Sequence, residues 1–173
     1  MFRSSHWLIL AVLSLSVCVC AADQNNKTDA NTTCNFDPNR QLAVDYQKVE
    51  VGHGKKGSGE AVSFGKVWAP GGKPLTLFAN TPISVGGTNI PDGAYTMFLI
   101  PQEEKPWTLI ISRSTDTSGM YDHSKDLARV PMEFGVLSQT EPEFVAYFAH
   151  VAPNQCNLRL DLRKTRAWVD FRR

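Results

Sequence analysis

Apolar residues recur at every second position over most of the chain, and no stretch of useful length has the spacing of a helix. Leu42, Val44 and Tyr46 start this pattern, and residues 130–136 repeat it. Because successive side chains of a strand point to opposite faces of a sheet, a period of two predicts strands. Turn residues separate about nine or ten such short runs. We therefore expect an all-β chain of mostly antiparallel strands, folded as a single β-sandwich or a partly closed barrel.

Two turns precede an apolar run in the middle of the chain. Gly86 and Gly87, flanked by short β-type runs, predict a tight hairpin, and Pro91 and Gly93 mark a second turn. Tyr95 follows this second turn directly. A tyrosine at such a corner often bonds through its hydroxyl to nearby backbone, so we expect a structural role for it.

Several runs carry a prediction about their place in a sheet. Residues 94–100 and 107–113 are apolar on both faces, which predicts central strands. Residues 62–68 are also expected to form a strand. Pro131 cannot donate a backbone hydrogen bond, so its strand should lie at a sheet edge or contain a bulge.

The C-terminal segment changes the phase of its alternation. Apolar residues occupy even positions over 158–162 and odd positions over 167–171. A strand cannot change phase without turning over its faces, so we expect a bulge or turn near Lys164–Arg166. Arginines and aspartates lie between the apolar positions, which predicts cross-strand pairs on a solvated face. These residues are Arg159, Asp161, Arg163, Arg166, Asp170 and Arg172.

The first 22 residues (1–22) have the order of a secretory signal peptide: a positive charge at Arg3, an apolar run, and small residues. The apolar run is shorter than the roughly 20 residues that span a bilayer. We therefore expect cleavage before Asp23, export to the periplasm or the medium, and no transmembrane helix in the mature chain. Two alternatives stay open: an uncleaved anchor helix, and a lipoprotein modified at Cys18 or Cys20.

Removal of residues 1–22 leaves a chain with balanced charge. The sequence has 18 basic and 17 acidic residues, and the signal segment holds one basic and no acidic residue, so 17 of each remain. Without a basic face we expect no binding to nucleic acid. Residues 23–40 are polar and predict a flexible N-terminal arm. Residues 41–173 are then expected to form a single β domain.

Cys34 and Cys156 are the cysteines that remain after cleavage. An even pair in an exported chain predicts one disulfide. Such a bridge would tie the N-terminal arm to a strand near the C-terminus. Two separate thiols remain the alternative, because a sequence shows neither the distance nor the geometry of a pair.

No motif assigns a chemistry to this chain. Residues 52–57 have the glycine spacing of a dinucleotide-binding loop, but a strand rather than a helix follows them, so we expect a flexible hairpin loop and no cofactor. His53, Asp122 and His123 are weak candidates for a metal site. They lie in polar loops but lack the spacing of a zinc motif. No catalytic residue is assigned from the sequence.

Short motifs within residues 46–171 are similar to those of a known family. The chain supplies Phe64–Trp68, Val85, Gly87, Ile90, Pro91, Gly93, Tyr95, Phe98, Pro101, Trp107–Ile110, Gly119, Tyr121, Asp122, Asp126, Arg129 and Val130. In this set it resembles an exported bacterial family, the domain of unknown function 2911. The resemblance implies an exported, mostly β single domain and brings no established reaction. Residues 69–74 depart from the pattern, since other members have a run similar to Arg-Thr-Gly-Ala-Asn-Glu there.

We therefore expect a non-enzymatic module that binds an unidentified ligand or protein partner, or that supports an envelope assembly. An alternative is a hydrolase or metal-dependent enzyme that uses Asp122 and His123. A weaker alternative is a carbohydrate-binding face formed by Trp68, Trp107 and Trp168, for which packing in the core is the favoured interpretation. Whether the protein is an enzyme stays undecided, with binding favoured.

Overall fold

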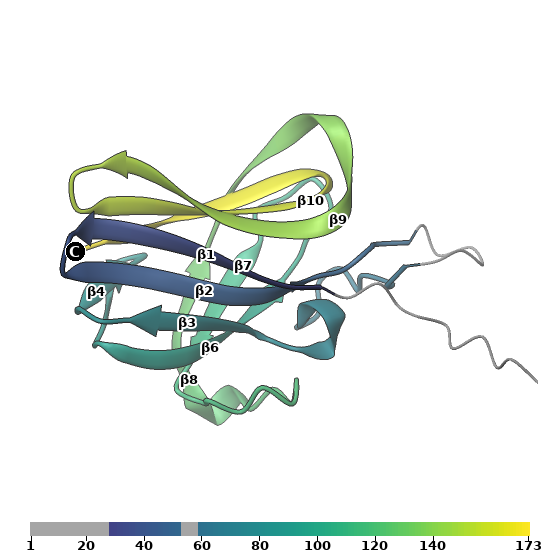
Figure 1. Ribbon diagram of the computed structural model, residues 1–173. Coiled ribbons are helices and arrows are strands. Elements are labelled where there is room, and N and C mark those ends of the chain that lie inside the picture. Colours follow the sequence, from purple (N-terminus) through teal and green to yellow (C-terminus); the bar gives the residue numbers. More distant parts are fainter. Residues whose placement is uncertain (1–27, 53–58) are drawn as a thin grey trace, which may run out of the picture.

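Ten strands form two antiparallel sheets in the computed structural model, which describes residues 28–52 and 59–173 (Figure 1). The larger sheet has the order β1-β2-β3-β6-β7-β8, and the smaller has the order β5-β4-β10-β9. The strands are β1 Thr28–Asp37, β2 Arg40–Lys48, β3 Leu75–Ala79, β4 Ile83–Val85, β5 Thr88–Ile90, β6 Gly93–Ile100, β7 Thr108–Ser112, β8 Asp126–Pro131, β9 Glu133–Ala152 and β10 Gln155–Arg172. The all-β prediction is confirmed, and the architecture is the sandwich.

Two short 3-10 turns complete the described elements, η1 at Pro70–Gly72 and η2 at His123–Lys125. Within residues 28–52 and 59–173, no helix has the length and apolar character needed to cross a bilayer. The predicted signal peptide over residues 1–22 and the candidate His53 both lie outside the described residues.

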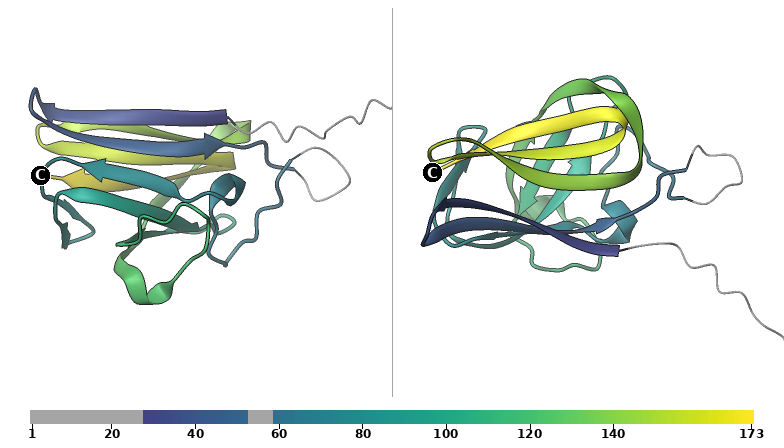
Figure 2. Two further views of the ribbon diagram at one scale, coloured as in Figure 1. Left: turned by 60° about the horizontal axis from the view of Figure 1, so that its bottom comes forward. Right: turned by 45° about the horizontal axis from the view of Figure 1, so that its top comes forward.

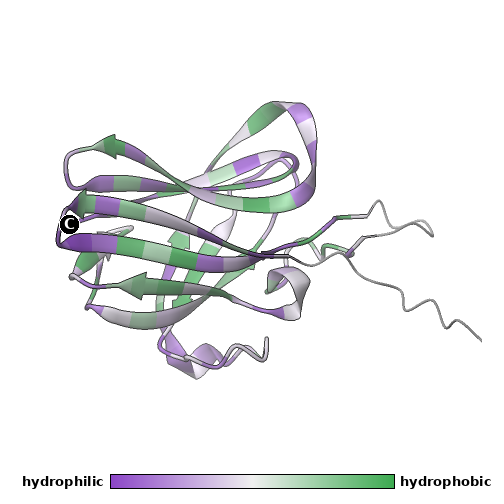
Figure 3. Ribbon diagram, in the orientation of Figure 1, coloured by the Kyte–Doolittle hydropathy of each residue, from purple (hydrophilic) through white to green (hydrophobic). Residues whose placement is uncertain are grey.

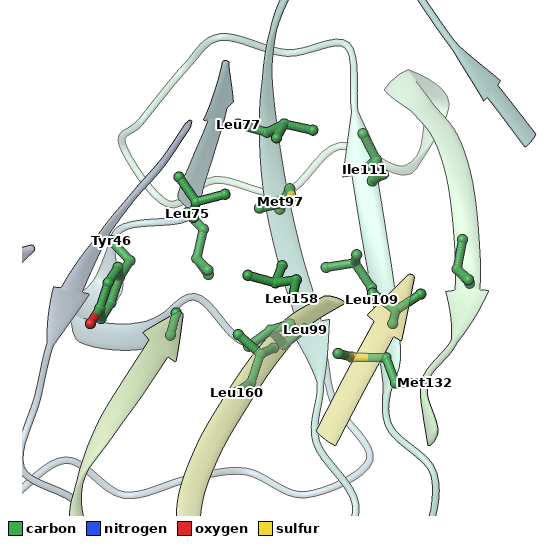
Figure 4. Close-up of a cluster of buried hydrophobic side chains, with 14 of the residues drawn as sticks. Tyr46, Leu75, Leu77, Met97, Leu99, Leu109, Ile111, Met132, Leu158 and Leu160 are labelled. Carbon is green, nitrogen blue, oxygen red and sulfur yellow. The ribbon is translucent and has the colours of Figure 1, made fainter. Parts of the chain in front are cut away.

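The core lies between the two sheets and is built from the alternate residues of their strands (Figure 3). Leu158 and Leu160 of β10 face Met97, Leu99 and Leu109 of the larger sheet (Figure 4). These side chains are fully buried. Burial of one such side chain stabilises a fold by roughly 1.5–3 kcal/mol, so the alternation decides which face of each strand turns inward.

β6 and β7 lie inside the larger sheet and are covered on both faces, as predicted. Met97 and Leu99 face the core, whereas Phe98 and Ile110 lie on the opposite side of the sheet. Phe98 is nevertheless only 1% exposed. The segment between β7 and β8 covers it, because the ring of Tyr121 contacts Phe98 edge-on at 5.2 Å.

The two predicted turns before β6 are present. Gly86 and Gly87 have φ angles of 56° and 82° and join β4 to β5. These left-handed angles favour glycine. The Tyr95 hydroxyl donates to the carbonyl of Pro91 at 2.9 Å, so this tyrosine ties the second turn to the start of β6.

The prediction of a strand over residues 62–68 is wrong. Within this range Trp68 alone pairs, through a bridge to Leu99 with backbone hydrogen bonds of 2.7 and 3.0 Å. Gly65 has a φ of 75° and lies in a turn. This turn interrupts the chain, so the alternation of the sequence there does not correspond to a continuous strand.

The chain passes from the larger sheet to the smaller one at Met132. β8 ends at Pro131 and is the outermost strand of its sheet, so the edge position predicted for this proline is confirmed. Met132 is buried, and its N–H donates to the carbonyl of Trp107 at 2.8 Å. β9 begins at the next residue, so one alternating run supplies strands to both sheets.

β10 turns back on itself part-way along its length (Figure 2), and the turn lies at Arg163. This residue has a φ of 56°, and the pairing with β9 shifts register on both sides of it. The N–H of Arg173 donates to the carbonyl of Asn154 at 3.0 Å, so the two ends of the strand lie side by side. The predicted turn is confirmed, centred on Arg163. It returns the odd apolar positions to the face that the even ones occupy.

Residues 28–37 form β1, which corrects the prediction of a flexible arm over residues 23–40. Ala30, Thr32 and Cys34 are each less exposed than the residues beside them, so the segment does alternate. Small and polar side chains carry the alternation, and the sequence therefore shows no apolar period. The described β structure begins with β1 at residue 28, and residues 23–27 lie outside the described part of the chain.

A disulfide joins Cys34 of β1 to Cys156 of β10, with their Cα atoms 6.3 Å apart. The predicted bridge is confirmed, and the separation lies within the usual range of about 4.4–6.8 Å. Beside it, the N–H of Phe148 in β9 donates to Oγ1 of Thr32 at 2.9 Å. These contacts fasten the outermost strand of the larger sheet to the smaller sheet.

We expect reduction of this disulfide to lower the free energy of unfolding by about 4–5 kcal/mol, because the bridge closes a loop across a separation of 122 residues in the unfolded chain. Urea denaturation with and without a reducing agent measures the difference. A variant with Cys34→Ala and Cys156→Ala is the matched control and should resemble the reduced protein. Equal midpoints for the oxidised and reduced protein would contradict the expectation.

Candidate functional site

Three donors converge on one carboxylate oxygen at the start of β8. Oδ2 of Asp126 accepts a hydrogen bond from the Tyr121 hydroxyl at 2.7 Å, with Nδ1 of His123 at 2.9 Å and Nε of Arg129 at 3.4 Å. We call these four residues the Asp126 cluster. The turn η2 brings His123 and Asp126 together at a spacing of three residues, and β8 places Arg129 three residues further on.

The cluster lies partly beneath the surface. The Asp126 side chain is 9% exposed, and its other oxygen, Oδ1, is buried without a hydrogen-bond partner among the described residues. Burial, together with the hydrogen bond to Asp126 and the charge of that carboxylate, raises the pKa of Tyr121 from 10.0 to about 12. The tyrosine therefore stays protonated and donates a hydrogen bond to Asp126 over the whole physiological range.

Of the residues predicted for a loop site, His123 joins the cluster and Asp122 does not. Oδ1 of Asp122 accepts from the backbone N–H of Ser124 at 3.0 Å and from its hydroxyl at 2.7 Å. These bonds lower the pKa of the Asp122 carboxyl and cap the start of η2 through Ser124. The carboxylate that faces the imidazole is Asp126.

A carboxylate bonded to one imidazole nitrogen orients the ring, and hydrolases use this arrangement to position a general base. The His123 side chain is 76% exposed, so its other nitrogen is open to solvent. No serine or cysteine of the described segments bonds to this imidazole. Over residues 28–52 and 59–173, no three histidine, cysteine or acidic side chains gather closely enough to hold a metal ion.

The three tryptophans do not share a face. Trp68 and Trp107 are core residues, 7% and 0% exposed. Their indole N–H groups donate to Oε1 of Glu60 and to the carbonyl of Gln102, each at 2.8 Å. Trp168 lies instead on the outer face of the smaller sheet, which corrects the proposed three-tryptophan surface.

Polar side chains form rows across the two halves of β10 on that outer face. Asn157 donates to Asp170 at 2.9 Å. Arg166 donates to both oxygens of Asp161, at 2.7 and 2.6 Å. The cross-strand pairs predicted from the alternating arginines and aspartates are therefore present. They also set the register between the two halves of β10.

The row between these two pairs contains two aromatic residues, an arginine and an acid. Arg159 lies opposite Tyr147 of β9, and Trp168 lies opposite Glu133. The register of the neighbouring rows places Arg159 opposite Trp168. The indole N–H of Trp168 donates to Glu133 at 3.1 Å, and Nε of Arg159 donates to Oδ1 of Asn157 at 2.8 Å.

A groove of about 520 Å³ runs over these rows, within the usual range of small-molecule sites. We call it the β10 groove and define it by the residues Glu133, Asn157, Arg159, Arg166, Trp168 and Asp170. The sequence pattern placed Arg159, Arg166 and Asp170 of this groove on one polar face, but it did not indicate Glu133 or the pairing of Arg159 with Trp168. The change of phase in the C-terminal segment was the signal that could have revealed this pairing. Once a strand turns back on itself, an odd-numbered position of one half and an even-numbered position of the other can lie on the same face.

A family model described as a protein of unknown function, DUF2911, matches residues 27–171. The chain belongs to this family. No curated protein and no solved structure matches it. The resemblance drawn from the sequence motifs is thereby confirmed at the level of the family.

The structure shows where the polar DUF2911 motif residues lie. Tyr121, Asp126 and Arg129 are separated in the motif and meet in the Asp126 cluster. The segment that departs from the family pattern lies beside the same loop, because a side chain at Gly119 would overlap the carbonyl of Gly72 in η1. The three motif residues therefore lie together in this chain, and the segment 69–74, Ala-Pro-Gly-Gly-Lys-Pro, lies beside the loop that carries Tyr121.

The raised pKa of Tyr121 predicts a loss of stability at alkaline pH. The folded protein holds this proton more tightly than the unfolded chain does, so the contribution is fully present below about pH 10 and is lost as the pH rises toward about 12. Denaturant unfolding at a series of pH values measures it. The wild type should lose more stability over this interval than Tyr121→Phe, and parallel profiles would contradict the prediction.

Proposed function

We propose that this DUF2911 chain is an exported, non-enzymatic module that binds a ligand or a partner in the β10 groove. The disulfide supports export, since such bonds persist in oxidising compartments, as does the signal-like order of residues 1–22. The single observation that carries the binding proposal is the middle row of the groove, where Arg159 lies opposite Trp168.

Tryptophan and arginine are the side chains that most often dominate binding energy at interfaces. In this groove they lie on paired strands, not on loops, and hydrogen bonds to Asn157 and Glu133 fix their positions. A site that is already ordered loses little conformational freedom when a ligand binds. The rows therefore offer a groove whose side chains are already in place before a ligand binds.

A panel of glycans and peptides is screened by heteronuclear NMR. We expect a compound that binds in the groove to shift the indole N–H resonance of Trp168. Trp168→Ala should lower the affinity for the compound that binds most tightly by roughly 30-fold, about 2 kcal/mol, as for a central aromatic contact. Phe78→Ala is the matched control, because Phe78 is 43% exposed on the larger sheet, away from the groove.

If Trp168→Ala binds the ligand with unchanged affinity while both variants are folded, the proposed binding site is wrong. So would a panel in which no compound moves the resonances of β9 and β10. Thermal unfolding of each variant shows that the fold is intact.

The Asp126 cluster favours a second candidate, a hydrolase in which His123 acts as general base. The motivating observation is the separation of 2.9 Å between Nδ1 of His123 and Oδ2 of Asp126. On this hypothesis the purified protein turns over substrates of a broad esterase, amidase and phosphatase panel, and His123→Ala abolishes the activity. The binding proposal expects no turnover in the wild type, so the panel separates the two candidates.

A further inference from the structure

The carboxylates of the β10 groove are already bonded within the protein. Asp170 accepts from Gln155 and Arg172 at Oδ2, and from Asn157 at Oδ1. Glu133 accepts from the indole of Trp168. Both oxygens of Asp170 and one oxygen of Glu133 are therefore engaged, so the groove offers few open acceptors to a cationic ligand.

Arg159 is different, because only one of its nitrogens has a partner. Nε donates to Asn157, which is 5% exposed and is itself fixed by its bond to Asp170. Within the described ranges, the two terminal nitrogens have neither a hydrogen-bond acceptor nor an acidic partner. Arg166 of the same groove is engaged, since it binds Asp161 and lies over the ring of Tyr147. Arg159 is therefore the open cationic group of the groove, and its fork is held in a fixed orientation.

Trp168 provides a surface beside this fork. Its six-membered ring lies over Gly135 of β9, where a Cβ atom would stand 3.3 Å from the ring carbon Cζ3. The absence of a side chain at Gly135 lets the indole settle against the strand. The indole N–H is taken by Glu133, so the apolar ring, not the N–H, is what Trp168 offers to a ligand.

From this juxtaposition we infer that the ligand is an acidic glycan, whose uronate carboxylate binds the terminal nitrogens of Arg159 while its pyranose ring packs on Trp168. This inference rests on the proposed binding function and names its ligand class. A guanidinium fork matches a carboxylate through two parallel hydrogen bonds. One open guanidinium balances one negative charge, which suits a carboxylate better than a doubly charged phosphate. The C–H faces of a pyranose ring supply the apolar surface that an indole ring contacts.

The test compares two ligands that differ only in charge: an oligogalacturonate and its methyl ester. Isothermal titration calorimetry and the NMR shift of the Trp168 indole measure binding to the oxidised, signal-free chain. We expect the wild type to bind the acid at least about tenfold more tightly than the ester, because a charge-assisted pair is lost in the ester. The preference should weaken as salt is raised.

Arg159→Gln should bind the acid no better than the ester and should leave binding of the ester unchanged. Arg159→Lys keeps the charge without the fork, and we expect it to retain part of the preference. Arg40→Gln, at the start of β2, is the control with the same change of charge outside the groove, and it should behave as the wild type. Circular dichroism and thermal unfolding verify the fold of each variant.

The remaining outcomes separate the two proposals. If the wild type binds acid and ester equally, or binds a sulfated or phosphorylated glycan more tightly than the uronate, the inference fails while the groove remains a binding site. Binding of an acidic peptide but of no glycan likewise overturns the glycan assignment alone. If no glycan or peptide perturbs the groove, both the inference and the proposed function fail.

Discussion

The return of β10 at Arg163 is the constraint on which both faces of the smaller sheet depend. One half of the strand directs Leu158 and Leu160 into the core, and the other half directs Val169 and Phe171 to the same side. Because side chains alternate, the remaining positions of both halves must face outward together. The apolar core and the polar rows of the groove are consequences of a single turn, so a shift of that turn by one residue would change both.

Local signals of the sequence were sufficient for the hairpin between β4 and β5 and for the turn of β10. Gly86 and Gly87 define their hairpin alone, and the change of phase located the turn of β10 to within a residue or two. The strand expected over residues 62–68 failed because Gly65 adopts a left-handed conformation that alternation does not reveal. β1 was missed for the opposite reason, since it is a true strand whose inward positions are filled by small residues.

The candidate sites depended on contacts that sequence spacing does not encode. Asp122 is adjacent to His123, but a residue next in sequence on a 3-10 turn points elsewhere, and the carboxylate three residues on faces the imidazole. The pairing of Arg159 with Trp168 required both the turn and its register. A sequence can show that arginine, aspartate and tryptophan alternate in this segment, whereas only the register shows which of them remain open to a ligand.

The covalent link between Cys34 and Cys156 makes the attachment of β1 to the smaller sheet depend on the redox state of the compartment. β1 directs few apolar side chains inward, and it is held to the smaller sheet by this bond, by one hydrogen bond from β9 and by the ion pair of Asp37 with Arg173 just after β10. In a reducing compartment β1 would keep its pairing with β2 but lose its covalent link to the smaller sheet. In an oxidising one the same strand closes the side of the sandwich and covers a sheet edge that could otherwise pair with another chain. Oxidation of the two cysteines therefore both stabilises the fold and keeps this sheet edge covered.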